Sequence, residues 1–169
     1  MMSGMTRGGV TDLTRGQRLR RTLNWVNLST PLGLGIAAVT RSPVRRGPHG
    51  LYVATGYRPR LPFAAAFTVG NVVLVRGRAP HGQPLSAALS PDLVAHEAAH
   101  ATQYAALLGL PFLPAYGVAA VWSVLRTGDP ASRNVFERRA GLGIGGYRER
   151  PVRPWRASRR RGGRGTLNT

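Results

Sequence analysis

The chain has 169 residues, of which 43% are hydrophobic, and it contains no cysteine. This length is enough for one domain with its own core, and the lack of cysteine excludes disulfide frameworks, iron–sulfur clusters and thiolate zinc sites. The formal net charge is +18, and all 24 basic residues are arginine, against six acidic residues. Such a charge predicts non-specific electrostatic attraction to nucleic acid or to anionic membranes.

Both ends of the chain are basic and lack apolar periodicity. We predict a disordered basic N-terminal arm over residues 1–21, a folded domain over residues 22–147 and a disordered Arg-rich tail over residues 148–169. The tail has a single aromatic residue, Trp155, so it lacks the interleaved aromatics of a single-strand stacking platform. The arms are predicted either to be simply solvated or to contact nucleic acid or anionic membrane, and no obligate partner is evident.

The segment over residues 25–39 follows a cluster of arginines and has the apolar character of a late signal peptide. Polar residues and Pro31 interrupt it, and no clean cleavage site follows. We therefore expect this segment to form a loop and a strand at the start of the domain. We also expect the protein to be cytoplasmic, with secretion or membrane association as alternatives.

Three short strands are expected next, over residues 51–57, 63–68 and 71–76. Each run is rich in apolar or β-branched residues and is bounded by glycine or proline. They predict a small sheet or a β-hairpin.

A helix is predicted to begin after Ser90, which is a good N-cap. Pro91 suits the first helical position, and Asp92 suits the positive end of the helix dipole. Gly109 and Pro111 are predicted to end this helix.

Residues 104–125 carry no charge, which is long enough to suggest a membrane span. Two prolines interrupt the run, and its first turns complete the preceding helix. We therefore predict a buried second helix over residues 113–126, with a membrane-embedded segment as the alternative. A third, short helix is predicted over residues 134–140, capped by Ser132 or Asn134. The fold class is α+β: a small β-sheet or hairpin followed by three helices.

The first of these helices contains the sequence HExxH. His96 and His100 are four residues apart, so they lie on one helical face and can bind one metal ion. Glu97 stands about 100° further round the helix, where it can hold a water molecule without binding the metal. Two ligands, a base and an open coordination position are what zinc-assisted hydrolysis requires.

A catalytic zinc ion usually has a third protein ligand. No histidine follows the motif, and the carboxylates that follow it are Asp129, Glu137 and Glu149. Glu137, on the predicted short helix, is favoured, although a surface ion pair with a neighbouring arginine would also explain it. Asp129, in a Gly-Asp-Pro turn, is the alternative, and Glu149 belongs to the basic tail. Two upstream residues in turns remain as further candidates, His49 and His81.

A wider pattern surrounds the motif. The stretch from His96 to Gln103 has the form HExxHxxQ, and an uncharged helix and then Asn-x-x-Glu-Arg-x-Ala follow it. Over about residues 67–147 the chain resembles small zincin-type metallopeptidases of the gluzincin kind. One departure is Val135, where similar sequences often have proline.

The resemblance implies a zincin-like minimal domain that binds Zn²⁺ through His96, His100 and Glu137. It also implies that Glu97 is the general base of a metallopeptidase that cleaves a peptide or protein substrate. Two other function classes remain open. One is a non-catalytic, zinc-stabilised module whose basic arms bind nucleic acid or anionic membrane, and the other is a protease that such arms localise to DNA.

Residues near the motif are candidates for supporting roles. Gln103 lies three residues after His100, so we expect it either to hydrogen-bond near the site or to satisfy a buried polar group. A tyrosine hydroxyl could stabilise the oxyanion of the reaction. The candidates are Tyr104, Tyr116 and Tyr147.

Overall fold

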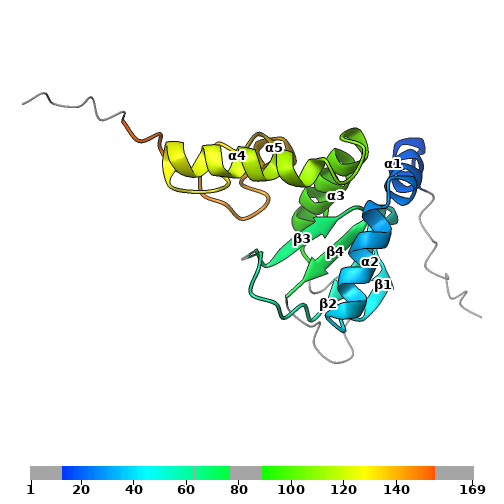
Figure 1. Cartoon of the computed structure of the whole chain (residues 1–169). Coiled ribbons are helices and arrows are strands. Elements are labelled where there is room, and N and C mark those ends of the chain that lie inside the picture. The colour runs from blue at the N-terminus through cyan, green and yellow to red at the C-terminus, as the bar shows by residue number, and fades with distance from the viewer. Residues whose placement is uncertain (1–12, 63, 77–88, 155–169) are drawn as a thin grey trace, which may run out of the picture.

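The structure, a computed structural model, describes residues 13–62, 64–76 and 89–154. It is an α+β domain in which helices surround a small mixed sheet (Figure 1). In chain order the elements are α1 (Arg15–Val26), α2 (Ser29–Val39), β1 (Val44–Arg46), the 3₁₀ turn η1 (Pro48–Gly50), β2 (Tyr52–Thr55), β3 (Ala66–Val69), β4 (Val72–Val75), α3 (Pro91–Ala106), α4 (Phe112–Thr127) and α5 (Val135–Ala140).

The sheet has four strands in the order β1-β2-β4-β3. β2 and β4 are parallel, whereas the β1–β2 and β3–β4 pairs are antiparallel. The three predicted strands are present at the predicted places, and β1 adds an edge strand that the sequence pattern did not indicate. β3 forms the opposite edge, next to the helix that carries the motif.

β4 is buried along its whole length, which explains its continuous apolar sequence. Val72 and Leu74 pack into a cluster with Ala37 of α2, while Val73 packs into a second cluster with Ala101 of α3. Successive side chains of a strand point to opposite faces, so α2 and α3 cover the two sides of the sheet.

The N-terminal predictions are wrong from residue 15 onward. Helix α1 replaces the last part of the expected disordered arm, and α2 replaces the expected loop-and-strand start. α1 begins with a capping box in which Thr14 and Gln17 bond each other's backbone N–H groups. Residues 1–12 lie outside the described residues.

Polar side chains hold α1 to the domain, which is why no apolar periodicity predicted it. The Asn24 Nδ2 donates to the carbonyl of Ala101 on α3 at 2.8 Å and to the Asn71 Oδ1 at 3.1 Å. Arg20 is also buried and donates to the carbonyl of His49. These long-range hydrogen bonds replace the apolar contacts that a sequence pattern can show.

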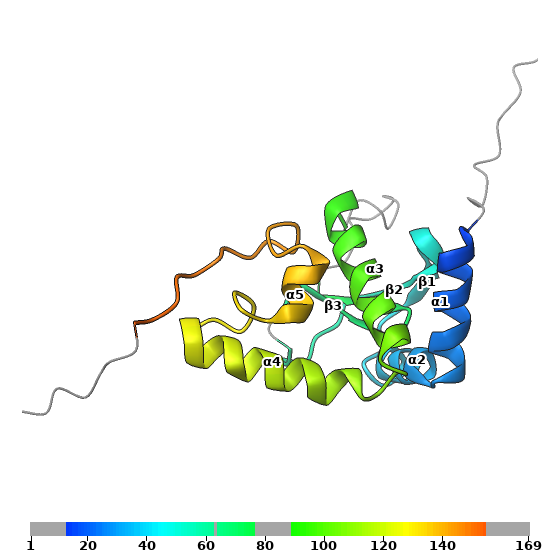
Figure 2. The ribbon, with the colours of Figure 1, turned by 90° about the horizontal axis from the view of Figure 1, so that it is seen from above.

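The helices after the sheet lie where they were predicted, but the second is not the buried helix that was expected, because among its residues only Phe112, Ser123 and Thr127 are buried. The Ser90 Oγ accepts a hydrogen bond from the backbone N–H of Leu93 at 3.1 Å, and Pro91 is the first residue of α3. The predicted second and third helices correspond to α4 and α5. α4 extends away from the sheet, with α5 along one side (Figures 1 and 2). Among the described residues, none of the helices combines the length and apolar character that a membrane crossing requires.

The described part of the predicted tail, residues 148–154, has no helix or strand, but it is attached to the domain. The backbone N–H of Arg150 donates to the Ser132 Oγ at 2.9 Å, and that of Arg153 donates to the carbonyl of Arg126 at 2.8 Å. Residues 155–169, including Trp155, lie outside the described residues.

Candidate metal centre

Three buried side chains meet between α3 and α5. His96 and His100 come from one face of α3, and Glu137 comes from the first turn of α5. The two Nε2 atoms are 3.1 Å apart, His96 Nε2 lies 3.3 Å from Glu137 Oε2, and His100 Nε2 lies 3.7 Å from Glu137 Oε1. A tetrahedral zinc ion with bonds of about 2.0–2.1 Å needs donor atoms about 3.3–3.4 Å apart. The group could therefore hold a metal ion.

Hydrogen bonds on the far side of each imidazole orient it toward the cluster. The Nδ1 of His96 lies 3.2 Å from the carbonyl of Ala140, which can only accept. Gln103 donates its Nε2 to the carbonyl of Phe136 at 2.9 Å, so its Oε1, 2.9 Å from the Nδ1 of His100, must accept. Both rings therefore carry a proton on Nδ1, which leaves the Nε2 lone pairs free to bind a metal.

The carboxylate of Glu137 is 2% exposed and incompletely satisfied by hydrogen bonds. Its Oε1 accepts from the Tyr116 hydroxyl, but its Oε2 has no hydrogen-bond partner among the described residues. A buried carboxylate oxygen without a partner is costly. A cation between this oxygen and the two imidazoles would satisfy it, so the residues fit a metal ion.

Electrostatics favour an ionised Glu137 and a positive charge beside it. Burial alone would raise the pKa of this carboxyl, but its interactions with the two adjacent imidazoles hold the pKa well below its usual range. Burial alone would lower the pKa of His100, but the neighbouring carboxylate of Glu137 raises it. A proton on His100 or a bound metal ion can each supply the positive charge that this carboxylate requires.

Glu97 is buried beside the cluster without being one of its three members. Its Oε2 accepts a 2.6 Å hydrogen bond from the Thr68 hydroxyl on β3. Burial raises the pKa of Glu97, and the bond from Thr68 and the two nearby imidazoles oppose this only in part. Sequence reasoning missed Thr68, because no local pattern shows which hydroxyl of an edge strand faces the motif helix.

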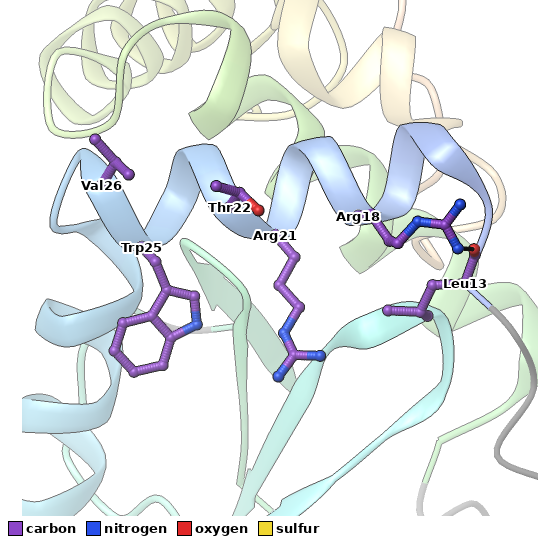
Figure 3. A pocket seen from close by; sticks show the side chains of 6 residues that line it. All are labelled: Leu13, Arg18, Arg21, Thr22, Trp25 and Val26. Carbon is purple, nitrogen blue, oxygen red and sulfur yellow. Dashed lines mark hydrogen bonds between the residues drawn. The ribbon is translucent and has the colours of Figure 1, made fainter.

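A cavity of about 430 Å³ opens onto the site. The residues of the cluster and Glu97 form its polar floor. Its walls are largely apolar and come from α2, β3 and α4, with Leu32, Phe67 and Leu113 among them. A second hollow, on α1 (Figure 3), is lined by Leu13, Arg18, Arg21, Thr22, Trp25 and Val26. It holds no carboxylate or imidazole and is not a metal site.

The three candidate tyrosines have different surroundings. Tyr104 is 1% exposed and packs on Phe112, with ring centroids 4.4 Å apart. Tyr116 binds Glu137, as described above. Tyr147 lines the cavity with its ring 6.3 Å from that of His96. Burial raises the pKa of all three phenols, so each is a neutral donor at neutral pH.

One glycine of the site was not predicted. A Cβ on Gly145 would lie 2.6 Å from the Cε1 of His96, so a larger residue would displace the ring. Gly145 also lies two residues before Tyr147 in the chain. The 141–147 loop therefore covers one side of the His96 ring, and position 145 has room only for glycine.

The other candidates for the third ligand are engaged elsewhere or lie outside the described residues. The Oδ1 of Asp129 accepts from the Ser132 N–H and hydroxyl, both at 2.7 Å, and so organises the loop before α5. Glu149 is exposed and pairs with Arg138 at 2.7 Å. His49 lies in η1 and bonds Gln17. His81 lies outside the described residues. The surface ion pair considered for Glu137 is excluded by its burial.

No protein-family model matches the chain, and no match was found among curated proteins or solved structures. The chemistry open to the site follows from its own side chains. Three donors converge from one side, a cavity opens on the other, and a buried carboxylate stands next to them. This arrangement can bind a metal ion and leave it accessible to water and a small substrate group.

Proposed function

We propose that the chain is a zinc-dependent hydrolase, and specifically a metallopeptidase with a gluzincin-like arrangement of ligands. One observation carries the proposal: a helical glutamate far along the chain meets both histidines of the HExxH motif at metal-ligand spacing. Glu97, the second carboxylate of the site, lines the same cavity. A purely structural metal site has no use for a second, uncoordinated carboxylate facing an open cavity.

Zinc is the metal that this donor set suits best. Two neutral imidazoles and one carboxylate are typical ligands of catalytic zinc, and the chain has no thiolate that would favour a softer metal. When bound, the ion supplies Lewis-acid activation of a water molecule in the cavity.

Glu97 is the proposed general base. Thr68 engages one oxygen of its carboxylate, which leaves the other to take a proton from water. Its raised pKa brings the carboxyl closer to neutral pH, where a base can also return the proton to the leaving amine. Thr68 fixes the rotamer, so the base is positioned before the substrate arrives.

A peptide substrate fits the shape of the surroundings. β3 is an edge strand of the sheet and borders the cavity, so an extended peptide can add to it by backbone hydrogen bonds. The apolar walls would hold a hydrophobic side chain near the scissile bond. Tyr147 is the tyrosine best placed to donate to the oxyanion, because Tyr116 is occupied by Glu137 and Tyr104 packs in the core.

The test is to compare wild type with Glu97→Gln for zinc content and for cleavage of a casein-type substrate. We expect one zinc per chain in both proteins and a rate about 10²–10⁴-fold lower in the variant, because only the base is lost. The control is Asp92→Asn on the exposed first turn of α3, which we expect to cleave as wild type does. A metal-free wild-type protein would remove the proposal. Zinc binding without turnover in wild type would favour the alternative, a metal-stabilised binding module.

A further inference from the structure

The outward face of α4 is apolar and has no partner among the described residues. The residues that hold α4 to the domain are Phe112, Ser123 and Thr127. On the opposite side Val118, Val121 and Leu125 are 71%, 60% and 69% exposed. Their spacing of three and four residues places them in one stripe along the helix. We call these three residues the α4 face.

An apolar stripe of this kind on the solvent side of a helix indicates an interaction surface. α4 is the reverse of an ordinary surface helix, because its exposed side is apolar and it contains a single charged residue, Arg126. The guanidinium of Arg126 lies 5.5 Å from the ring centroid of Trp122, which is 56% exposed. A tryptophan and a basic residue at the edge of an apolar face are typical of the boundary between lipid tails and headgroups.

Positive charge gathers at the C-terminal end of this face. Arg153 is bonded to the backbone of Arg126, and none of the ion pairs between described residues involves either arginine. The chain then continues into residues 155–169, which contain five arginines and no acidic residue. An apolar helix face beside a polybasic segment is the combination that holds proteins on anionic bilayers.

We propose that the α4 face lies flat on the surface of an anionic lipid bilayer. The helix has 16 residues, or about 24 Å, which is shorter than the hydrocarbon core of about 30 Å, and its inner side is fixed to the domain. A second copy of the chain would cover the face only by bringing two charges of +18 together. Nucleic acid would match the arginines but would leave the apolar stripe in water.

The experiment is co-sedimentation of the full chain with lipid vesicles. We expect binding to vesicles that contain phosphatidylserine, weak binding to pure phosphatidylcholine, and a decrease with added salt. The triple variant Val118→Gln, Val121→Gln, Leu125→Gln should bind about tenfold more weakly or worse, because it removes the apolar contact. The matched control is Leu19→Gln with Val39→Gln, which are 61% and 85% exposed on α1 and α2, and it should bind as wild type.

Two further measurements make the test specific. Arg126→Gln with Arg153→Gln should weaken binding to phosphatidylserine vesicles about fivefold for each arginine, without touching the apolar stripe. A vesicle-induced blue shift of tryptophan fluorescence should be smaller in Trp122→Phe than in wild type. Glu97→Gln should bind vesicles as wild type, since the α4 face is independent of the metal centre.

Three results would overturn the proposal. The first is equal binding to neutral and anionic vesicles, or no binding to either. The second is unchanged binding of the triple α4 variant when circular dichroism shows it to be folded. The third is a dimer in sedimentation velocity that the triple variant dissociates, which would assign the face to a second copy of the chain.

Discussion

Helices α3 and α4 follow each other in the chain and each has 16 residues, yet they depart from ordinary helix patterning in opposite ways. α3 buries ionisable side chains, including His96, Glu97 and His100, while α4 exposes apolar ones. Each departure is costly in isolation, since buried polar groups need partners and exposed apolar groups favour association. On α3 the partners lie within the domain. On α4 the described residues offer none, and the proposal is that a lipid bilayer covers its exposed face.

The largest effect is expected at Glu137 on α5, the proposed third ligand of the metal centre. Glu137→Ala should weaken zinc binding by more than about a hundredfold, because a direct ligand contributes more than the outer hydrogen bonds that orient it. Asp129→Ala is the matched control, since it removes a carboxylate from the neighbouring loop without touching the cluster. Zinc titration of both variants checks this. Retention of zinc by Glu137→Ala together with its loss in Asp129→Ala would contradict the assignment.

A smaller effect is expected from the hydrogen bond that holds the His100 ring. Gln103→Leu keeps the side-chain size but removes the acceptor at the Nδ1 of His100. We expect zinc affinity to fall about 10–100-fold, because the ring and its tautomer are no longer fixed. Thr102→Leu, on the exposed side of the same turn, should leave the affinity unchanged. Equal affinities of the two variants would mean that packing alone orients the imidazole.

The pH dependence of stability also tests the proposed metal centre, because a proton and a metal ion compete for the Nε2 atom of His100. The pKa of His100 is raised in the fold. This raised pKa stabilises the metal-free protein fully at pH values below 6.5, the ordinary pKa of histidine, and the contribution is lost as pH rises through the raised pKa. The lowered pKa of Glu137 stabilises the fold at pH values above 4.5, the ordinary pKa of glutamate. This contribution is lost only as pH falls through the lowered pKa.

The pair therefore stabilises the metal-free protein most between these two pH values, whereas zinc binds more tightly as protons leave. We expect the rise in Tm on adding zinc to grow between about pH 6 and about pH 8. Thermal unfolding with zinc and with chelator at each pH measures it. A zinc-induced shift that shrinks with rising pH would show that the His100–Glu137 pair is not the binding site.

The smallest effect is expected on α4. Val121→Gln should change the free energy of unfolding by less than about 0.5 kcal/mol, because the residue is 60% exposed in the folded domain. Phe112→Ala, at the buried start of the same helix, should cost about 3–5 kcal/mol. Urea unfolding compares the two. A large cost for Val121→Gln would mean that α4 has a partner in the folded chain.

Local sequence determined the parts of the molecule that depend on short-range physics. The cap at Ser90 and the four-residue spacing of the histidines specify α3 and place two ligands on one face, because both follow from the helical period. Apolar, β-branched runs between turns specified β2, β3 and β4. With only three carboxylates after the motif, the sequence also favoured Glu137, although it could not exclude Asp129.

Tertiary structure alone decided the rest. The fold brings Glu137 next to both histidines, the Thr68 hydroxyl next to Glu97 and the Tyr116 hydroxyl next to Glu137. These contacts join residues that are far apart in the chain. It also formed α1, whose attachment depends on buried amide and guanidinium hydrogen bonds, such as that of Asn24 to α3. A helical or strand period records which side chains share a face, but it carries no information about which distant donor will meet which acceptor.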